Sequence, residues 1–119
     1  MGAIISAKCK CGFKIHSMYL GGGMNNYLVS SKFPNYCKSC KTLFIANMYD
    51  EQIVCSNCNS NDTVTYSHPS VVKILDQSKL MDWRGGHKKH GKLVLYPRNN
   101  LCPSCDTFSL EFTSVGRWD

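Results

Sequence analysis

Residues 36 to 60 read "YCKSCKTLFIANMYDEQIVCSNCNS", with two C-x-x-C pairs on either side of 14 residues of strand-like sequence. Four thiols at this spacing are typical of a structural metal site, of disulfides or of redox chemistry. The other cysteines of the chain help to decide among the three.

All the cysteines of this 119-residue chain fall into close pairs, and none is left over. The pairs are Cys9 and Cys11, Cys37 and Cys40, Cys55 and Cys58, and Cys102 and Cys105. Eight thiols complete two four-thiolate sites. We therefore predict two structural zinc ions that use all eight cysteines, with iron as the less favoured metal because ligand type does not separate the two.

The surroundings of the chain bear on the choice between metal and disulfides. The opening residues lack the pattern of a secretory signal, and no stretch approaches the roughly 20 apolar residues of a membrane span. We expect a cytoplasmic protein, in which paired cysteines favour metal binding over cystines.

Three arrangements of the four pairs around two metals are possible: sequential, nested and crossed. The nested arrangement joins the two middle pairs across 14 residues, whereas the sequential one closes gaps of 25 and 43 residues. Shorter loops lose less entropy on closing. We favour the nested arrangement, although the spacing excludes none of the three.

Strand-like sequence follows every pair, namely "FKIHSMYL", "TLFIANMY", "TVTY" and "TFSLEF". We predict a mostly β protein that forms one compact domain over 1–119, with a central ribbon at 36–66 between outer knuckles at 8–20 and 101–113. The central ribbon is expected to be a hairpin over 41–54 that turns at Asp50 and Glu51. The one helix candidate covers 67–84, where Pro69 suits a first turn and Val71, Ile74 and Leu75 recur at helical spacing.

The residue after each second cysteine often turns through positive φ in a metal knuckle. Gly12, Asn59 and Asp106 tolerate this conformation well. Lys41 holds the same position in the remaining knuckle, and we expect an ordinary turn there.

The two central pairs and the segment "KTLFIANMYDEQIV" between them resemble a zinc ribbon. The stretch "LCPSCD" resembles the C-terminal knuckle of such a ribbon, although ribbon knuckles commonly end in Gly and this one ends in Asp106. The whole layout is similar to small bacterial two-ribbon proteins. The resemblance implies a fold and a metal cofactor but no activity.

An enzyme is not expected, because four thiolates leave no open coordination position on a metal. Thioredoxin-like chemistry needs one active pair on a βαβ scaffold, whereas this chain has four similar pairs. A rubredoxin-like iron electron carrier remains a minor alternative.

The sequence is basic, with a formal charge of +6. Eight thiolates contribute −8 and two zinc ions contribute +4, which leaves about +2 on the metal-loaded chain. A local basic segment survives this correction, "RGGHKKHGK" at residues 84–92.

Two kinds of partner fit these features. The first is nucleic acid, for which the candidate contacts are Arg84, Lys88, Lys89, Lys92 and Arg98, with Lys38 and Lys41 beside the central ribbon. The second is a protein that docks on ribbon edges or on aromatic side chains such as Tyr27, Phe33 and Tyr36. We favour nucleic acid slightly over this adaptor role, and we expect no membrane and no small-molecule substrate.

Overall fold

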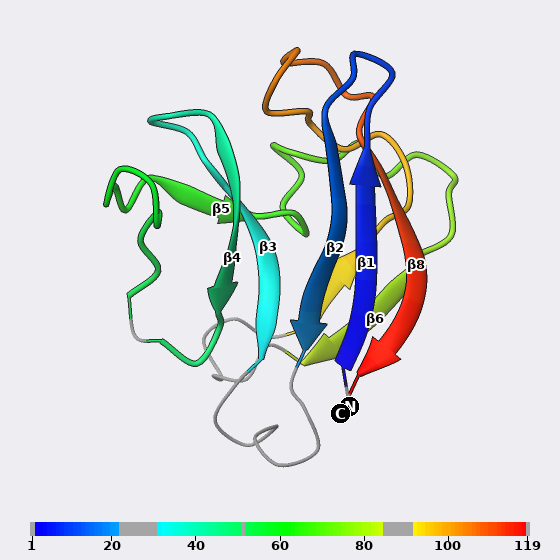
Figure 1. Ribbon diagram of the computed structural model, residues 1–119, viewed down its shortest axis with the longest axis horizontal. Coiled ribbons are helices and arrows are strands. Elements are labelled where there is room, and N and C mark those ends of the chain that lie inside the picture. The colour runs from blue at the N-terminus through cyan, green and yellow to red at the C-terminus, as the bar shows by residue number, and fades with distance from the viewer. Residues whose placement is uncertain (1, 22–30, 51, 85–91, 119) are drawn as a thin grey trace.

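The computed structural model describes residues 2–21, 31–50, 52–84 and 92–118, and these residues form strands and turns without a helix (Figure 1). The predicted mostly β fold is confirmed. The strands are β1 (Gly2–Lys8), β2 (Lys14–Gly21), β3 (Lys32–Cys37), β4 (Thr42–Asn47), β5 (Thr63–Thr65), β6 (Met81–Arg84), β7 (Lys92–Leu95) and β8 (Glu111–Trp118).

Six of these strands form one antiparallel sheet made of two three-stranded units. In the outer unit, β1 lies between β2 and β8, and in the central unit β3 pairs with both β4 and β5. A single residue pair between strands, Gly21 with Lys32, joins the two units through β2 and β3. The sheet therefore opens between β2 and β3, as Figure 1 shows.

The two units share one topology. In each, a hairpin turns at a cysteine pair, a second cysteine pair precedes the third strand, and the third strand pairs with the first strand of the hairpin. The central unit is inserted in the chain between β2 and β8 of the outer unit. Because β8 returns to pair with β1, Gly2 faces Trp118 and the two ends of the chain lie side by side (Figure 1).

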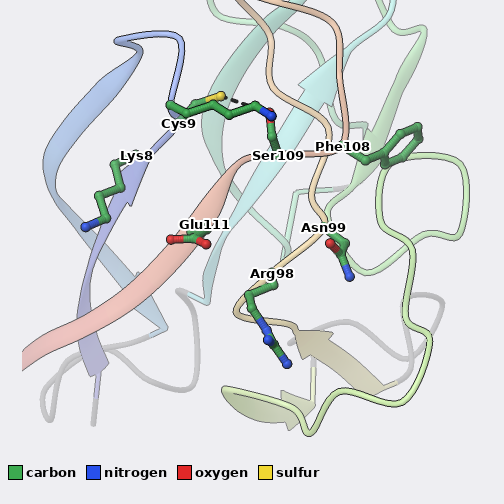
Figure 2. A pocket seen from close by; sticks show the side chains of 8 residues that line it. Lys8, Cys9, Arg98, Asn99, Phe108, Ser109 and Glu111 are labelled. Carbon is green, nitrogen blue, oxygen red and sulfur yellow. Dashed lines mark hydrogen bonds between the residues drawn. The ribbon is translucent and has the colours of Figure 1, made fainter.

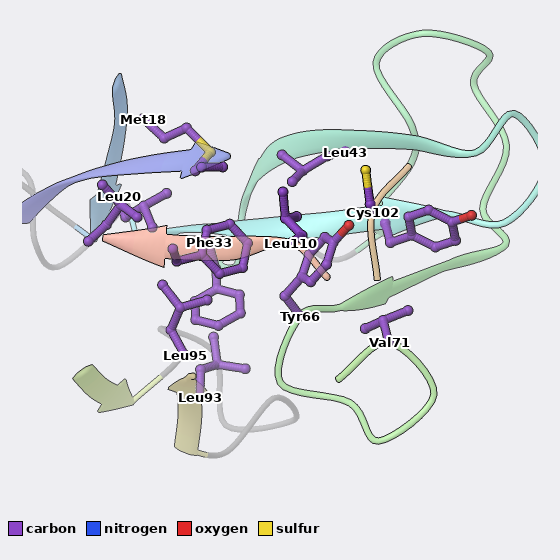
Figure 3. Close-up of a cluster of buried hydrophobic side chains, with 14 of the residues drawn as sticks. Met18, Leu20, Phe33, Leu43, Tyr66, Val71, Leu93, Leu95, Cys102 and Leu110 are labelled. Carbon is purple, nitrogen blue, oxygen red and sulfur yellow. The ribbon is translucent and has the colours of Figure 1, made fainter. Parts of the chain in front are cut away.

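The hydrophobic core lies between the sheet and the short β6–β7 hairpin. Period-two alternation places Ile5 and Ala7 of β1 on the buried face, and Leu93 and Leu95 of β7 pack against the same cluster (Figure 3). The Leu80 amide donates to the Leu95 carbonyl at 2.7 Å, and this bond extends the β6–β7 pairing to the residue that precedes β6.

Tyr66 joins the two units at the centre of this core (Figure 3). Its ring lies edge-on to Tyr36 of the central unit at 6.3 Å and to Phe112 of the outer unit at 5.5 Å between centroids. Its hydroxyl donates to the Leu101 carbonyl at 2.8 Å. This one side chain therefore bridges both three-stranded units and the segment that leads into the last knuckle.

The helix predicted over 67–84 is wrong. Residues 66–71 form turns, Val72 makes a β-bridge with Asn100, and 81–84 is strand β6. Backbone bonds explain the difference, because the Lys73 amide donates to Asn99 and the Leu101 amide donates to Val71, both across the chain rather than along it. The helical spacing of apolar residues arises from Val71, which is buried, and from Ile74 and Leu75, which are exposed.

The hairpin predicted over 41–54 is also wrong. Its first half is strand β4, but β4 pairs with the preceding strand β3, and 52–55 is not in a strand. Glu51, where the turn was placed, lies outside the described residues. The hairpin turns instead at Cys37 and Cys40, because the knuckle itself reverses the chain and brings Cys37 opposite Thr42.

Candidate metal centres

The fold gathers the eight cysteines into two groups of four, in the nested arrangement. The outer cysteine site comprises Cys9, Cys11, Cys102 and Cys105, and the central cysteine site comprises Cys37, Cys40, Cys55 and Cys58. All four sulfurs of each group lie within 4.8 Å of one another, and each group could hold a metal ion. Each three-stranded unit thus carries one site.

The sulfur spacing fits a tetrahedral metal ion. In the outer site, Cys9 Sγ lies 3.6 Å from Cys105 Sγ, and Cys11 Sγ lies 3.7 Å from Cys102 Sγ. In the central site, the Cys37–Cys58 and Cys40–Cys55 sulfur pairs are both 3.6 Å apart. Four thiolates at a Zn–S distance of about 2.3 Å around a tetrahedral ion lie about 3.8 Å apart. All eight cysteines are free thiols.

Three of the four knuckles are tight turns closed by a hydrogen bond within their own backbone. The amides of Asn59 and Asp106 each donate at 2.9 Å to the carbonyl of the cysteine four residues earlier, and the Gly12 amide donates to Cys9 at 3.0 Å. The first knuckle is C-x-C rather than C-x-x-C, so its donor and acceptor are three residues apart instead of four. Chain reversal at every knuckle aims two thiols at the same point.

All four knuckles pass through positive φ at the residue after the second cysteine. The φ values are 106° at Gly12, 54° at Lys41, 62° at Asn59 and 59° at Asp106. The prediction holds for three of these positions and is wrong for Lys41, which adopts the left-handed conformation despite its Cβ. Knuckle geometry therefore overrides residue preference at this position.

Hydroxyl and amide groups surround the sulfurs. Thr107 Oγ1 lies 3.1 Å from Cys105 Sγ, and Ser109 Oγ lies 3.1 Å from Cys9 Sγ. In the central site Thr42 Oγ1 lies 3.2 Å from Cys40 Sγ, and the Asn57 amide donates to Cys55 Sγ at 3.3 Å. Such outer-layer hydrogen-bond partners orient metal ligands.

These contacts act on the cysteine pKa values. The hydrogen bond with Thr42 and the one that Asn57 donates lower the pKa of Cys40 to about 6, and the hydrogen bond with Thr107 lowers the pKa of Cys105 to about 6. Burial acts in the opposite direction on Cys102 and raises its pKa to about 12. Four clustered thiolates repel one another unless a cation lies between them. A divalent cation bound by all four sulfurs resolves this conflict.

The sequence-predicted basic residues are only partly described. Lys88 and Lys89 lie outside the described residues. Arg84 and Lys92 are backbone partners across β6 and β7, and the structure describes only their backbone. Arg98 is exposed and lines a groove beside the outer cysteine site. Lys38 and Lys41 are exposed next to the central site.

Two aromatic residues predicted to face a partner belong instead to the core. Phe33 is fully buried and Tyr36 is 4% exposed, while Tyr27 lies outside the described residues. The prediction failed because β3 lies in the middle of the central unit and is covered on its core face. The exposed apolar side chains of the described chain are elsewhere, at Tyr19, Val54, Ile74, Leu75 and Val115.

Sequence reasoning missed a second group of cations around the outer site. Lys8, Lys10 and Lys14 are exposed, and Lys8 and Lys14 are direct partners across β1 and β2. Their signal was present in "KCKCGFK" at residues 8–14, where lysines alternate with the ligands. Lys73 is added by the fold, with its ammonium 4.7 Å from the centre of the Phe108 ring.

Comparisons with known proteins assign no family. No family model matches the chain, and neither a curated protein nor a solved structure gives a significant match. Within the described residues there is no helix long and apolar enough to cross a membrane. The chain is therefore characterised by its two four-cysteine sites and by the chemistry around them.

Proposed function

We propose that this chain is a non-enzymatic double zinc-ribbon protein in which two structural zinc ions support a nucleic-acid-binding surface. The observation that carries the zinc assignment is that two sulfur–sulfur distances in each site are 3.6 to 3.7 Å, close to the edge of a ZnS₄ tetrahedron, with all four sulfurs within 4.8 Å of one another. Each site supplies four thiolates, so a bound zinc ion has no position left for water or substrate.

The cation distribution supports nucleic acid as the partner. Five cationic side chains, Lys8, Lys10, Lys14, Lys73 and Arg98, are exposed around the outer cysteine site. Lys8 and Lys14 are direct partners on adjacent strands, a like-charge pair that costs stability, and Glu111 is the one acidic residue that faces Lys8, from β8. These five positive charges exceed the nearby negative charge, which comes from Asp106, from Glu111 and from the net −2 of a zinc ion with four thiolates.

Metal analysis of the purified chain tests the structural half of this proposal. We expect two zinc ions per chain, and we expect a strong chelator to unfold the protein because metal binding and folding are coupled. Iron in place of zinc would favour the electron-carrier alternative. A chain that retains its near-ultraviolet circular dichroism after complete metal removal would contradict a structural role for the metal.

Binding measurements test the functional half. Affinity for single-stranded RNA or DNA should decrease steeply with salt, because phosphate contacts release counterions. The alternative function is a protein-interaction adaptor, for which the exposed apolar pair Ile74 and Leu75 is the observation in favour, since Leu75 is 73% exposed. Failure to bind nucleic acid at low salt, together with salt-insensitive binding to a protein partner, would favour the adaptor.

A further inference from the structure

A groove of about 540 Å³ runs beside the outer cysteine site (Figure 2). It is lined by Lys8 and Cys9 at the end of β1, by Lys10, by the Arg98–Asn99 turn, and by residues 108, 109 and 111. We propose that this groove binds the phosphodiester backbone of single-stranded nucleic acid, an inference that rests on the proposed function and assigns its contact surface.

The cations of the groove are available to a ligand. No ion pair joins Lys8, Lys10 or Arg98 to another residue in the described part of the chain. Arginine and lysine with no internal partner are the side chains that proteins use for phosphate, and arginine can bind two phosphate oxygens at once. All three residues line the same groove, which places positive charge along the path proposed for the backbone.

The Arg98–Asn99 turn is held in place before any ligand arrives. The Arg98 amide donates to Gln77 Oε1 at 2.8 Å, and Gln77 Nε2 donates to the Arg98 carbonyl at 2.7 Å. The Lys73 amide donates to the Asn99 carbonyl at 2.9 Å. These three bonds involve the backbone of the turn and neither of its side chains. Figure 2 shows the Arg98 and Asn99 side chains among those that line the groove. The turn therefore loses less conformational entropy when a ligand binds.

The concave shape favours a single strand over a duplex. A positively charged groove that follows the backbone is the usual form of single-strand binding sites. Glu111 is the only acidic side chain among the described residues that line the groove, and it lies opposite Lys8 across β1 and β8. Its carboxylate repels an incoming phosphate, so its removal should strengthen binding rather than weaken it.

The test measures fluorescence anisotropy of labelled U12, dT12 and a 12-base-pair DNA duplex with the zinc-loaded full chain, between 50 and 200 mM salt. Replacing Lys8 and Arg98 together with Ala should weaken single-strand binding roughly tenfold and reduce the salt slope by about 1.4, because each phosphate contact on a single strand contributes about 0.7. The matched control, Lys32→Ala with Arg117→Ala, removes the same charge from exposed positions outside the groove.

Glu111→Gln should strengthen single-strand binding about two- to threefold, a gain that loss of folding does not produce. Equal weakening in the groove variant and in the control, or no gain with Glu111→Gln, would overturn the groove while leaving nucleic-acid binding by the chain intact. Tighter binding to the duplex than to either single strand would overturn the choice of ligand. A parent protein that binds none of the three probes would overturn both the groove and the proposed function.

Discussion

The ammonium of Lys41 lies 4.0 Å from the carboxylate of Asp106, and the two residues hold the same position in two different knuckles. Each is the fifth residue of a C-x-S-C-x-T sequence, at residues 37–42 and 102–107, and each has positive φ. The contact joins the central cysteine site to the outer one. Two separate metal sites therefore meet at a pair of exposed, oppositely charged turn residues.

The conformation of Lys41 matters more to stability than its charge. Both side chains of the pair are over half exposed, at 63% and 60%, so we expect loss of the ion pair to cost at most about 0.5 kcal/mol. Lys41→Gly should be neutral or stabilising by up to about 1 kcal/mol because Gly adopts positive φ freely. Lys41→Val should destabilise by about 1–2 kcal/mol.

Thermal unfolding of the zinc-loaded variants measures this difference, and Lys41→Gln serves as the control that removes the charge but keeps a side chain. A Val variant as stable as the Gly variant would show that the knuckle relaxes to negative φ at this position.

The nested grouping makes a specific prediction for double cysteine variants. Cys40→Ser with Cys58→Ser removes two ligands from the central site alone, so one metal ion per chain should remain. Cys40→Ser with Cys105→Ser removes one ligand from each site and should lower the metal content toward zero. Elemental analysis distinguishes the two results, and equal metal content in the two double variants would contradict the grouping.

The threonine hydroxyls near the sulfurs should contribute to metal affinity. Thr42→Val and Thr107→Val each keep the side-chain shape and remove the group that lies 3.2 or 3.1 Å from a cysteine sulfur. Loss of such an outer-layer contact should weaken zinc binding at the affected site about tenfold or more. Competition with a chromophoric chelator measures the change.

Thr113→Val is the matched control for these variants, because Thr113 is an exposed residue of β8 and no hydrogen bond joins it to a cysteine sulfur within the described residues. If all three variants retain zinc equally well, the threonines contribute packing alone.

Tyr66→Phe should destabilise the chain by about 1–3 kcal/mol because it leaves the Leu101 carbonyl without its hydroxyl donor in the core. Tyr96→Phe is the control, since the Tyr96 hydroxyl has no hydrogen bond within the described residues. Denaturant midpoints of the zinc-loaded proteins at pH 7 measure the difference, and equal midpoints would show that the hydrogen bond contributes nothing net.

The same residue predicts a pH dependence. Burial raises the pKa of Tyr66 above the value of about 10 for an unfolded tyrosine. A raised folded-state pKa contributes stability that is fully present below about pH 10 and is lost as pH rises toward the folded-state value. The stability difference between parent and Tyr66→Phe should therefore be constant from pH 7 to about pH 9.5 and decrease above it.

Local chemistry made the ligand set and the fold class predictable. Four cysteine pairs with no remainder indicate two four-thiolate sites whatever the path of the chain, because the ligand count is a property of composition. Strands after each pair were likewise readable, since the alternation of Leu110, Glu111 and Phe112 separates a buried face from an exposed one. The nested grouping followed from loop length, but only as the favoured one of three arrangements.

Tertiary structure decided the partners of those strands. Strand β4 pairs with β3 rather than with the segment after Asp50, because the knuckle of Cys37 and Cys40 reverses the chain before β4 begins, whereas the predicted turn at Asp50 lies after β4. The apparent helix after Pro69 became turns and a bridge, because the Asn99 carbonyl and the Leu101 amide supply cross-chain partners for its backbone.

The groove was equally hidden from the sequence. Lys8 and Arg98 are 90 residues apart in the chain and line one hollow because β8 returns to β1 and carries the last knuckle with it. Composition and spacing determined which atoms this protein offers to a metal. The order of strands in the sheet decided which charged side chains surround that metal, because only long-range pairing brings such distant residues together.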